Sequence, residues 1–434
     1  MESYFHLNRH NTNVKTEVLA GVSSFLATAY VIVVNPTILS QAGMPFSGVL
    51  TATVLVSFFS SVMMGFYARN PILVAPGMGL NAFFTYSAVL GMGISWQVAL
   101  GAVFWSGVVF LLLSLFNVRT LIVRAIPKPL RYAIAAGIGL FITLIGFANA
   151  KFIVANPSTI IGISPMTPAL LTFLAGLLLT AVFIVRNVKG GILLGILFTT
   201  LASYPIGRWW GTDLAPLITW QGLVAAPDFS LLFQLDLINS FKLSVVPVIF
   251  AFVFTDMFDS VSTFVGLAEA ANLMDENGEP QNVQRSLTTD AVATTLAGLV
   301  GSSPGTAYVE SAVGIEMGGR TGLTAVVGGA LFLPFLFLAP LLSMIPPIAT
   351  APALVLVGAF MVRPVTKIDW FKMDDAIPAF LAMVLIPFTY SITQGIIWGF
   401  LCWTALKLVT GKRNEISWML WVINIFAILA ILQH

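Results

Sequence analysis

The sequence predicts an all-α polytopic membrane protein with fourteen transmembrane segments arranged as two related halves. The first observation is composition, because hydrophobic residues make up 58% of the 434 residues and charged residues only 9%. Globular proteins have roughly 45–50% and 25%. The mean hydropathy of +0.95 agrees with this assignment. The other two observations are a series of long apolar runs and an uneven distribution of basic residues along the chain.

Composition also excludes several classes of protein and site. A net charge of +2 does not support an electrostatic nucleic-acid binder, which needs a basic face. The single cysteine, Cys402, cannot form an internal disulfide or a cysteine-built metal site. The three histidines stand near the chain ends, at His6, His10 and His434, so we expect no metal site and no cofactor. The polar N-terminus predicts that there is no cleavable signal peptide.

The apolar runs give the expected spans, since about 20 helical residues match the hydrocarbon core of a bilayer. In chain order the runs are 16–36, 48–68, 79–93, 96–116, 131–149, 168–186, 190–207, 241–266, 289–301, 306–317, 321–345, 350–362, 376–391 and 394–410. The runs that start near 79, 289, 306 and 350 are too short for a complete crossing. A last run at 416–432 either crosses the membrane or lies in its interface.

Basic residues set the orientation, because they favour the cytoplasmic side. With a cytoplasmic N-terminus and fourteen passages, three of the 20 basic residues fall outside, Lys151, Arg208 and Lys242, which leaves 17 inside. A miscounted span would invert every later loop and remove this bias. We therefore expect a multi-pass protein of the cytoplasmic (inner) membrane.

Two short segments seven spans apart resemble each other. Ala75-Pro-Gly-Met-Gly79 and Ser303-Pro-Gly-Thr306 each precede a short helical run. An odd number of spans between copies makes the second copy inverted, and inverted repeats are typical of secondary transporters with a site at mid-membrane. Prolines and glycines interrupt helices, so we expect extended backbone here, which is tolerated at membrane depth where it lines a cavity.

Three acids lie within the predicted spans. Asp256 and Asp259 stand three residues apart in the run 241–266, and Glu310 follows the second broken segment. A carboxyl at bilayer depth is costly and usually faces a bundle interior or an aqueous cavity. The alternative is that an acid only caps or packs against a helix end, which applies most strongly to Asp256.

The broken segments supply the other candidate ligand-binding groups. Asn81 offers both a donor and an acceptor, although it could instead cap the first half-helix. Gly79, Thr306 and Ala307 lie where backbone groups are free to bind a ligand, and Phe83 is a nearby ring. Two carboxyls, an amide and free backbone suit a planar, neutral, donor-rich heterocycle, while amino acids and small anions stay open on physical grounds.

These segments resemble the nucleobase–cation symporter-2 family, and more closely its AzgA-like branch of guanine, hypoxanthine and adenine permeases. The resemblance covers nearly the whole chain. It is carried by the following motifs: Thr16-Glu-Val-Leu-Ala-Gly21, Tyr30-Val-Ile-Val-Val-Asn-Pro36, Ala75-Pro-Gly-Met-Gly-Leu-Asn-Ala-Phe-Phe84, Phe258-Asp-Ser260, Ala307-Tyr-Val-Glu-Ser311 and Gly318-Gly-Arg-Thr-Gly-Leu-Thr-Ala325.

The resemblance implies a seven-plus-seven inverted repeat with broken segments 3 and 10. It also implies a core domain formed by residues 1–116 and 241–345, and a gate domain formed by residues 117–240 and 346–434. It matches Asp259 and Glu310 to paired acids that bind the base and handle the proton, and Asn81 to a binding asparagine. Thr263, one turn after Asp259, joins Asp256 as a further candidate for proton coupling.

The leading interpretation is a proton-coupled purine permease that imports guanine and hypoxanthine by alternating access, with the base, protons and the lipid bilayer as its partners. A homodimer and sodium coupling stay open. The alternatives are an adenine or pyrimidine symporter of the same fold, a channel, or an intramembrane enzyme. The sequence has no H-E-x-x-H pair, G-x-S-x-G elbow or P-loop, so an enzyme is not expected.

Overall fold

The computed structural model describes residues 2–115, 127–209, 222–271, 273 and 281–418, together with 420, 421, 424, 425, 427 and 428. Several predicted features lie outside these residues. They are most of the last apolar run at 416–432 and two of the basic residues counted on the inside, Arg119 and Arg124. Four acids that fall between the predicted spans, and were therefore expected in loops, also lie outside these residues: Asp213, Asp275, Glu276 and Glu279.

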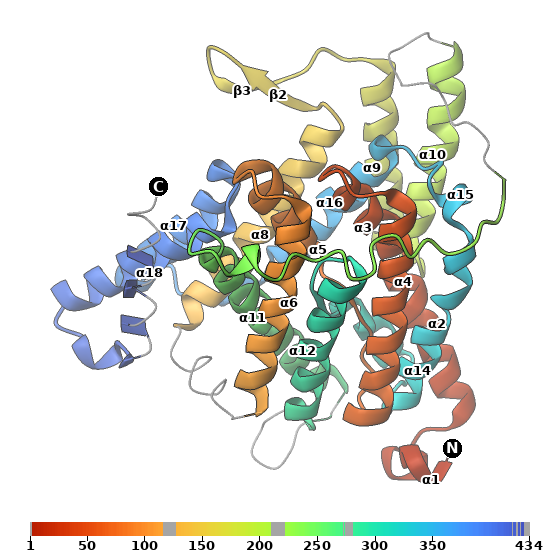
Figure 1. The fold of residues 1–434 in the computed structure, drawn as a ribbon, viewed down its shortest axis with the longest axis horizontal. Helices are drawn as coiled ribbons and strands as arrows, with labels where there is room; N and C mark the ends of the chain where they lie inside the picture. Colours follow the sequence, from red (N-terminus) through yellow and green to blue (C-terminus); the bar gives the residue numbers. More distant parts are fainter. Residues whose placement is uncertain are drawn as a thin grey trace.

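The described chain is predominantly helical (Figure 1). Its helices in the first half are α1 (Glu2–Phe5), α2 (Val14–Thr28), α3 (Val31–Ser40), α4 (Phe46–Met63), α5 (Met78–Ala82), α6 (Trp96–Leu115), α8 (Lys128–Asn149), α9 (Pro168–Val185) and α10 (Gly191–Trp209). Those in the second half are α11 (Val246–Ala271), α12 (Val283–Val300), α13 (Ala312–Glu316), α14 (Gly322–Ala330), α15 (Ala339–Leu342), α16 (Pro347–Met361), α17 (Met373–Thr389) and α18 (Ile392–Val409).

Every predicted apolar run up to residue 410 coincides with one or more of these elements. Within the described residues, eight helical segments are long and apolar enough to cross a membrane. One run that was expected to be too short is long enough, because the run 350–362 belongs to a 21-residue helical segment, Pro347–Lys367, which is one of the eight. The run 289–301 belongs to the 18-residue helix α12, whose first turns are polar, and α12 is not one of the eight.

The prediction of an all-α fold is wrong in one respect, because four short strands form two antiparallel pairs. β1 (Val74–Pro76) pairs with β4 (Gly305–Ala307), and β2 (Ile153–Asn156) pairs with β3 (Ile160–Ile163). The β2–β3 hairpin extends beyond the helices that surround it at the top of Figure 1. Helical periodicity cannot reveal strands of three or four residues, which is why the sequence did not predict them.

The helices pack in two groups. In the first, α6 lies against α12 and α11, and α14 lies against α2 and α4. In the second, α8 lies against α16 and α17, α9 lies against α10 and α16, and α17 lies against α18. Figure 1 shows α17 and α18 on the opposite side of the molecule from α2 and α14.

The chain returns from the second group to the first along residues 222–245. This segment is held by backbone hydrogen bonds from Phe233 to Leu299 and from Asp236 to Gln97, at the ends of α12 and α6. The Ser47 hydroxyl donates to Asp228 at 2.6 Å and holds the pKa of that carboxyl below its usual range. The segment therefore covers one end of the first helix group.

One acid of the first group has a structural role. The carboxylate of Glu17, on α2, is fully buried and accepts hydrogen bonds from the backbone N–H of Arg320 (2.9 Å) and Thr321 (3.3 Å) and from the Thr324 hydroxyl (2.6 Å). A carboxylate at the start of α14 satisfies N–H groups that the helix itself leaves unpaired. Glu17 thereby joins two motifs that stand 300 residues apart in the sequence.

We expect Glu17→Ala to lower the free energy of unfolding by about 2 kcal/mol or more, because buried N–H donors lose their acceptor. The measurement is thermal unfolding of the detergent-purified protein. Glu316→Ala is the matched control, since Glu316 is exposed and should change stability by less than ~0.5 kcal/mol. Equal unfolding temperatures for the two variants would contradict the capping role.

Candidate functional site

The centre of the molecule is the crossing of the two broken segments. β1 and β4 are buried and pair antiparallel, with Ala75 opposite Thr306. Each strand gives way to a short helical segment, α5 after β1, and a 3-10 turn (Val309–Ser311) leading into α13 after β4. Prolines and glycines prevent either segment from being helical throughout. Gly301, at φ +96°, ends α12 in a left-handed conformation that favours glycine and turns the chain toward β4.

A cavity of about 230 Å³ opens beside this crossing. The first helix group contributes Tyr30, the ends of both broken segments and two residues of α11. The second group contributes α8, α16 and the turn after α16. Its lining residues include Tyr30, Gly79, Asp259, Thr263, Thr306, Ala307, Glu310, Arg131, Tyr132, Phe360 and Lys367. The site is therefore built between the two groups of helices.

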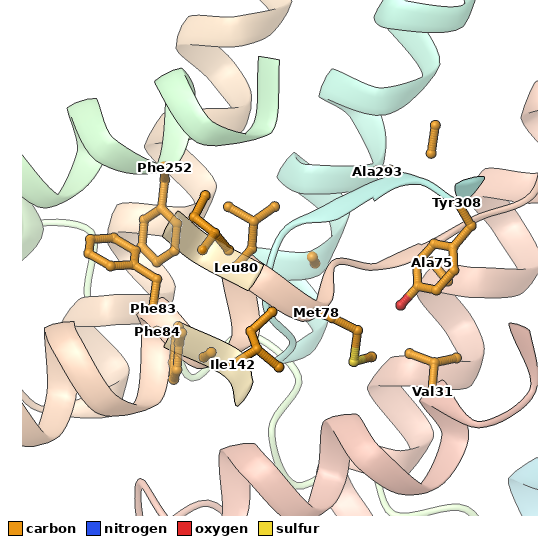
Figure 2. Packing of buried hydrophobic residues seen from close by; sticks show 14 of the residues in the cluster. Val31, Ala75, Met78, Leu80, Phe83, Phe84, Ile142, Phe252, Ala293 and Tyr308 are labelled. Carbon is orange, nitrogen blue, oxygen red and sulfur yellow. The ribbon is translucent and has the colours of Figure 1, made fainter. Parts of the chain in front are cut away.

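The carboxyl of Glu310 is positioned by an aromatic hydroxyl. Tyr30, at the break between α2 and α3, donates its O–H to Glu310 Oε1 at 2.7 Å. Tyr308 lies beside them, with its ring centroid 6.4 Å from that of Tyr30, and donates its own hydroxyl to the Pro76 carbonyl at 2.5 Å. Figure 2 shows the Tyr308 ring beside Ala75 of β1. Two tyrosines thus fix both the carboxyl and the strand next to it.

The two acids of α11 have different surroundings. Asp259 lines the cavity, together with Thr263 one turn later. Asp256 is buried behind it, and its Oδ2 accepts the Thr294 hydroxyl of α12 at 2.5 Å. The structure therefore brings Asp259, Thr263 and Glu310 to one cavity and places Asp256 against α12.

Asn81 and Phe83 do not line the cavity. Asn81 Nδ2 donates to Asn35 Oδ1 at 3.1 Å, inside a buried polar cluster. Phe83 packs edge to face on Phe252 of α11, with ring centroids 4.9 Å apart, as Figure 2 shows. Asn81 stands two helical residues after Gly79, which does line the cavity, so the helix has turned by about 200° and the Asn81 side chain points into the core.

Sequence reasoning missed several residues near the site. Asp290 of α12 is fully buried, and its signal was present, because an acid stands at the start of the run 289–301. Tyr132 and Phe360 had no such signal, since aromatic residues in apolar helices are common. Arg131 and Lys367 were assigned only to the cytoplasmic ends of spans, and the structure places both in the cavity wall.

The acids are not grouped in a way that suits a metal. Within the described part of the chain, no cluster of three or more His, Cys, Asp or Glu side chains could hold a metal ion. The cavity offers two carboxyls, two basic side chains, hydroxyl groups, aromatic rings and the backbone of two broken segments.

Comparison with known proteins identifies the family. A model of the Permease family matches residues 15–398. A protein of Methanocaldococcus jannaschii named as a permease is 44% identical over 431 residues, covering 98% of this chain and 96% of its own. The adenine permease AdeP of Escherichia coli is 39% identical over 434 residues (99% and 96%), and the guanine/hypoxanthine permease PbuO of Bacillus subtilis is 38% identical over 437 residues (99% and 99%).

Solved structures show the same fold at low identity. The transmembrane domain of the cyanobacterial bicarbonate transporter BicA superposes with a TM-score of 0.67 at 16% identity, covering 88% of this chain and 97% of that domain. The structure of SLC26A9 gives a TM-score of 0.63 at 9% identity, covering 92% of this chain and 66% of its own. The chain therefore belongs to the nucleobase–cation symporter-2 family of permeases, and it is a multi-pass membrane transporter rather than an enzyme.

Proposed function

We propose that the protein imports purine nucleobases across the cytoplasmic membrane with protons, by alternating access, and prefers guanine and hypoxanthine. The observation that carries the proposal is that Asp259 and Glu310 meet at one aromatic-lined cavity between two helix groups. Its volume of about 230 Å³ exceeds the roughly 150 Å³ of an engineered protein cavity that binds one benzene ring, which leaves room for a two-ring heterocycle.

The proposed topology has fourteen spans in a seven-plus-seven inverted repeat with broken segments 3 and 10. The antiparallel pairing of β1 with β4, each followed by a short helical segment, supports two inverted copies. The packing of the helices supports a core domain of residues 1–116 and 241–345 and a gate domain of residues 117–240 and 346–434.

The cavity has the features of a state open to the cytoplasm. Arg131 and Lys367 line it, and both stand at span ends that the basic-residue bias assigns to the inside. Gly79 marks a close approach between the two helix groups, since a Cβ there would lie 2.6 Å from Ile138 of α8. We propose that sliding of the gate helices past this contact opens the site alternately to each side.

Recognition would rest on Glu310. Tyr30 holds Oε1 of the carboxylate, and we propose that Oε2 accepts a hydrogen bond from the substrate. Guanine and hypoxanthine carry a protonated N1, and guanine adds a neighbouring 2-amino group, so both can donate to this carboxylate. Adenine is the second candidate substrate, because an adenine permease and a guanine/hypoxanthine permease are almost equally similar to this chain, at 39% and 38% identity.

The first prediction of this proposed function concerns proton coupling. A low-dielectric site disfavours the charged form of a carboxyl, so the cavity acids can carry a proton with each base. Uptake of radiolabelled guanine into cells should fall as external pH rises and collapse when an uncoupler is added. Uptake that changes neither with external pH nor with the uncoupler, but requires sodium, would exclude proton coupling.

The second prediction concerns recognition by Glu310. Glu310→Gln replaces one acceptor with a donor and should weaken guanine binding by about 2–5 kcal/mol, which is a factor of about 30 or more in Kd. Binding of guanine to the purified variant measures this, with Glu316→Gln as an exposed control on the same segment. An unchanged guanine affinity in Glu310→Gln would exclude this role.

The third prediction concerns selectivity. A site that pairs with N1–H rejects a purine that lacks it, because its own polar group is left unpaired. Unlabelled guanine and hypoxanthine should compete with each other for uptake far better than adenine does, and uracil should compete weakly. If adenine displaces labelled guanine as well as guanine itself does, the preference is wrong and the permease function still stands.

A further inference from the structure

A buried carboxyl lies behind the cavity wall, outside the reach of a substrate. Asp290, on α12, is fully buried. The Ser260 hydroxyl of α11 donates to its Oδ2, while its Oδ1 has no hydrogen-bond partner among the residues that the structure describes. The side chain is not among the residues that line the cavity.

Two hydroxyls connect this carboxyl to the cavity. Ser260 Oγ lies 2.9 Å from Thr306 Oγ1, and Thr306 belongs to β4 and lines the cavity. A continuous hydrogen-bonded path therefore runs from the cavity through Thr306 and Ser260 to Asp290. Because Ser260 donates to Asp290, Thr306 can donate to Ser260, and both hydroxyls then point their protons toward the carboxyl.

The surroundings of Asp290 do not compensate a negative charge. The titratable groups that face it from α11 are Asp256 and Asp259. The other elements that pack against α12, namely α4, α6, β1, β4 and the helical turn Met64–Ala68, carry no acidic or basic side chain, and the turn adds one phenol, Tyr67. No ion pair joins Asp290 to a basic side chain within the described part of the chain. An unpaired buried charge beside two other carboxyls is costly, and a bound proton removes that cost.

We propose that Asp290 is a proton-holding site that exchanges with the cavity through Thr306 and Ser260. A proton from cavity water or from Asp259 binds the Thr306 oxygen, the Thr306 proton passes to Ser260, and the Ser260 proton passes to the Asp290 carboxylate. One proton has then moved from the cavity to Asp290, and both hydroxyls are restored. This inference rests on the proposed proton-coupled transport.

The position of the path explains how such a proton would be linked to the substrate. Thr306 and Glu310 belong to the same broken segment, with β4 between α12 on one side and the cavity on the other. The Thr294 hydroxyl, one turn after Asp290 on α12, binds both Asp256 and the Gly305 carbonyl of β4. A movement of β4 between the two states of the transporter would therefore make or break the contact between Thr306 and Ser260.

The test uses the full-length protein in proteoliposomes with the membrane potential clamped. Asp290→Asn keeps the size of the side chain but cannot exchange a proton. At one proton per base, a gradient of about one pH unit drives about tenfold accumulation of radiolabelled guanine, or of adenine if that is the base transported. We expect Asp290→Asn to lose this accumulation and the proton flux that accompanies it. The rate at which the variant exchanges base across the membrane should stay within about twofold of the parent's rate, whereas coupling contributes about a factor of ten to accumulation.

Two further variants separate this role from a structural one. Ser260→Ala cuts the path and leaves Asp290 in place, so it should also exchange base without accumulating it. Thr289→Val removes a neighbouring buried hydroxyl that, among the described residues, donates to the Arg285 carbonyl of its own helix, and this variant should couple like the parent.

The possible outcomes are distinct. If the parent protein moves no protons with the base, the proposed function fails. If the parent is coupled and Asp290→Asn accumulates base with the same dependence on pH, the inference about Asp290 is overturned. A third outcome would also overturn the inference about Asp290: Asp290→Asn loses both exchange and accumulation, while Ser260→Ala remains fully coupled. The acid would then be needed for structure alone.

Discussion

The structure depends on the need to satisfy backbone hydrogen bonds at membrane depth, where no water can do so. β1 and β4 meet this need by pairing with each other. Their outer edges are satisfied by side chains, since the Ser61 hydroxyl bonds both the N–H and the carbonyl of Val74, and the Thr294 hydroxyl bonds the Gly305 carbonyl. Extended chain can therefore reach the centre of the protein, and its ends form one wall of the cavity.

The same need explains the buried polar cluster beside this crossing. Asn35 of α3 donates to Thr53 at 2.8 Å and to Ser302 at 3.1 Å, and it accepts from Asn81 and from Ser303. These bonds join both broken segments to α3 and α4. In this position Asn81 orients the first broken segment, while the cavity receives the backbone and side chains at the start of α5.

The two walls of the cavity are built differently. The wall that carries Asp259, Thr306 and Glu310 belongs to tightly interlocked elements, held by the strand pair and by tyrosine hydroxyls. The opposite wall, with Tyr132 of α8 and Phe360 of α16, belongs to helices that pack mainly among themselves. A rigidly held set of binding groups that faces a separate group of helices is the arrangement that the proposed alternating access requires.

The sequence alone determined the class of protein, the family, almost every helix and the acids that reach the cavity. Apolar runs and buried charges are local signals, because the bilayer imposes them on each segment separately. Only the tertiary structure decided which groups share a space. It turned Asn81 and Phe83 into the core, brought Tyr30 to Glu310, and placed Tyr132 and Phe360 in the opposite wall. Those outcomes depend on helix rotation and on contacts between residues far apart in the chain, and neither is encoded in the hydrophobicity of a single segment.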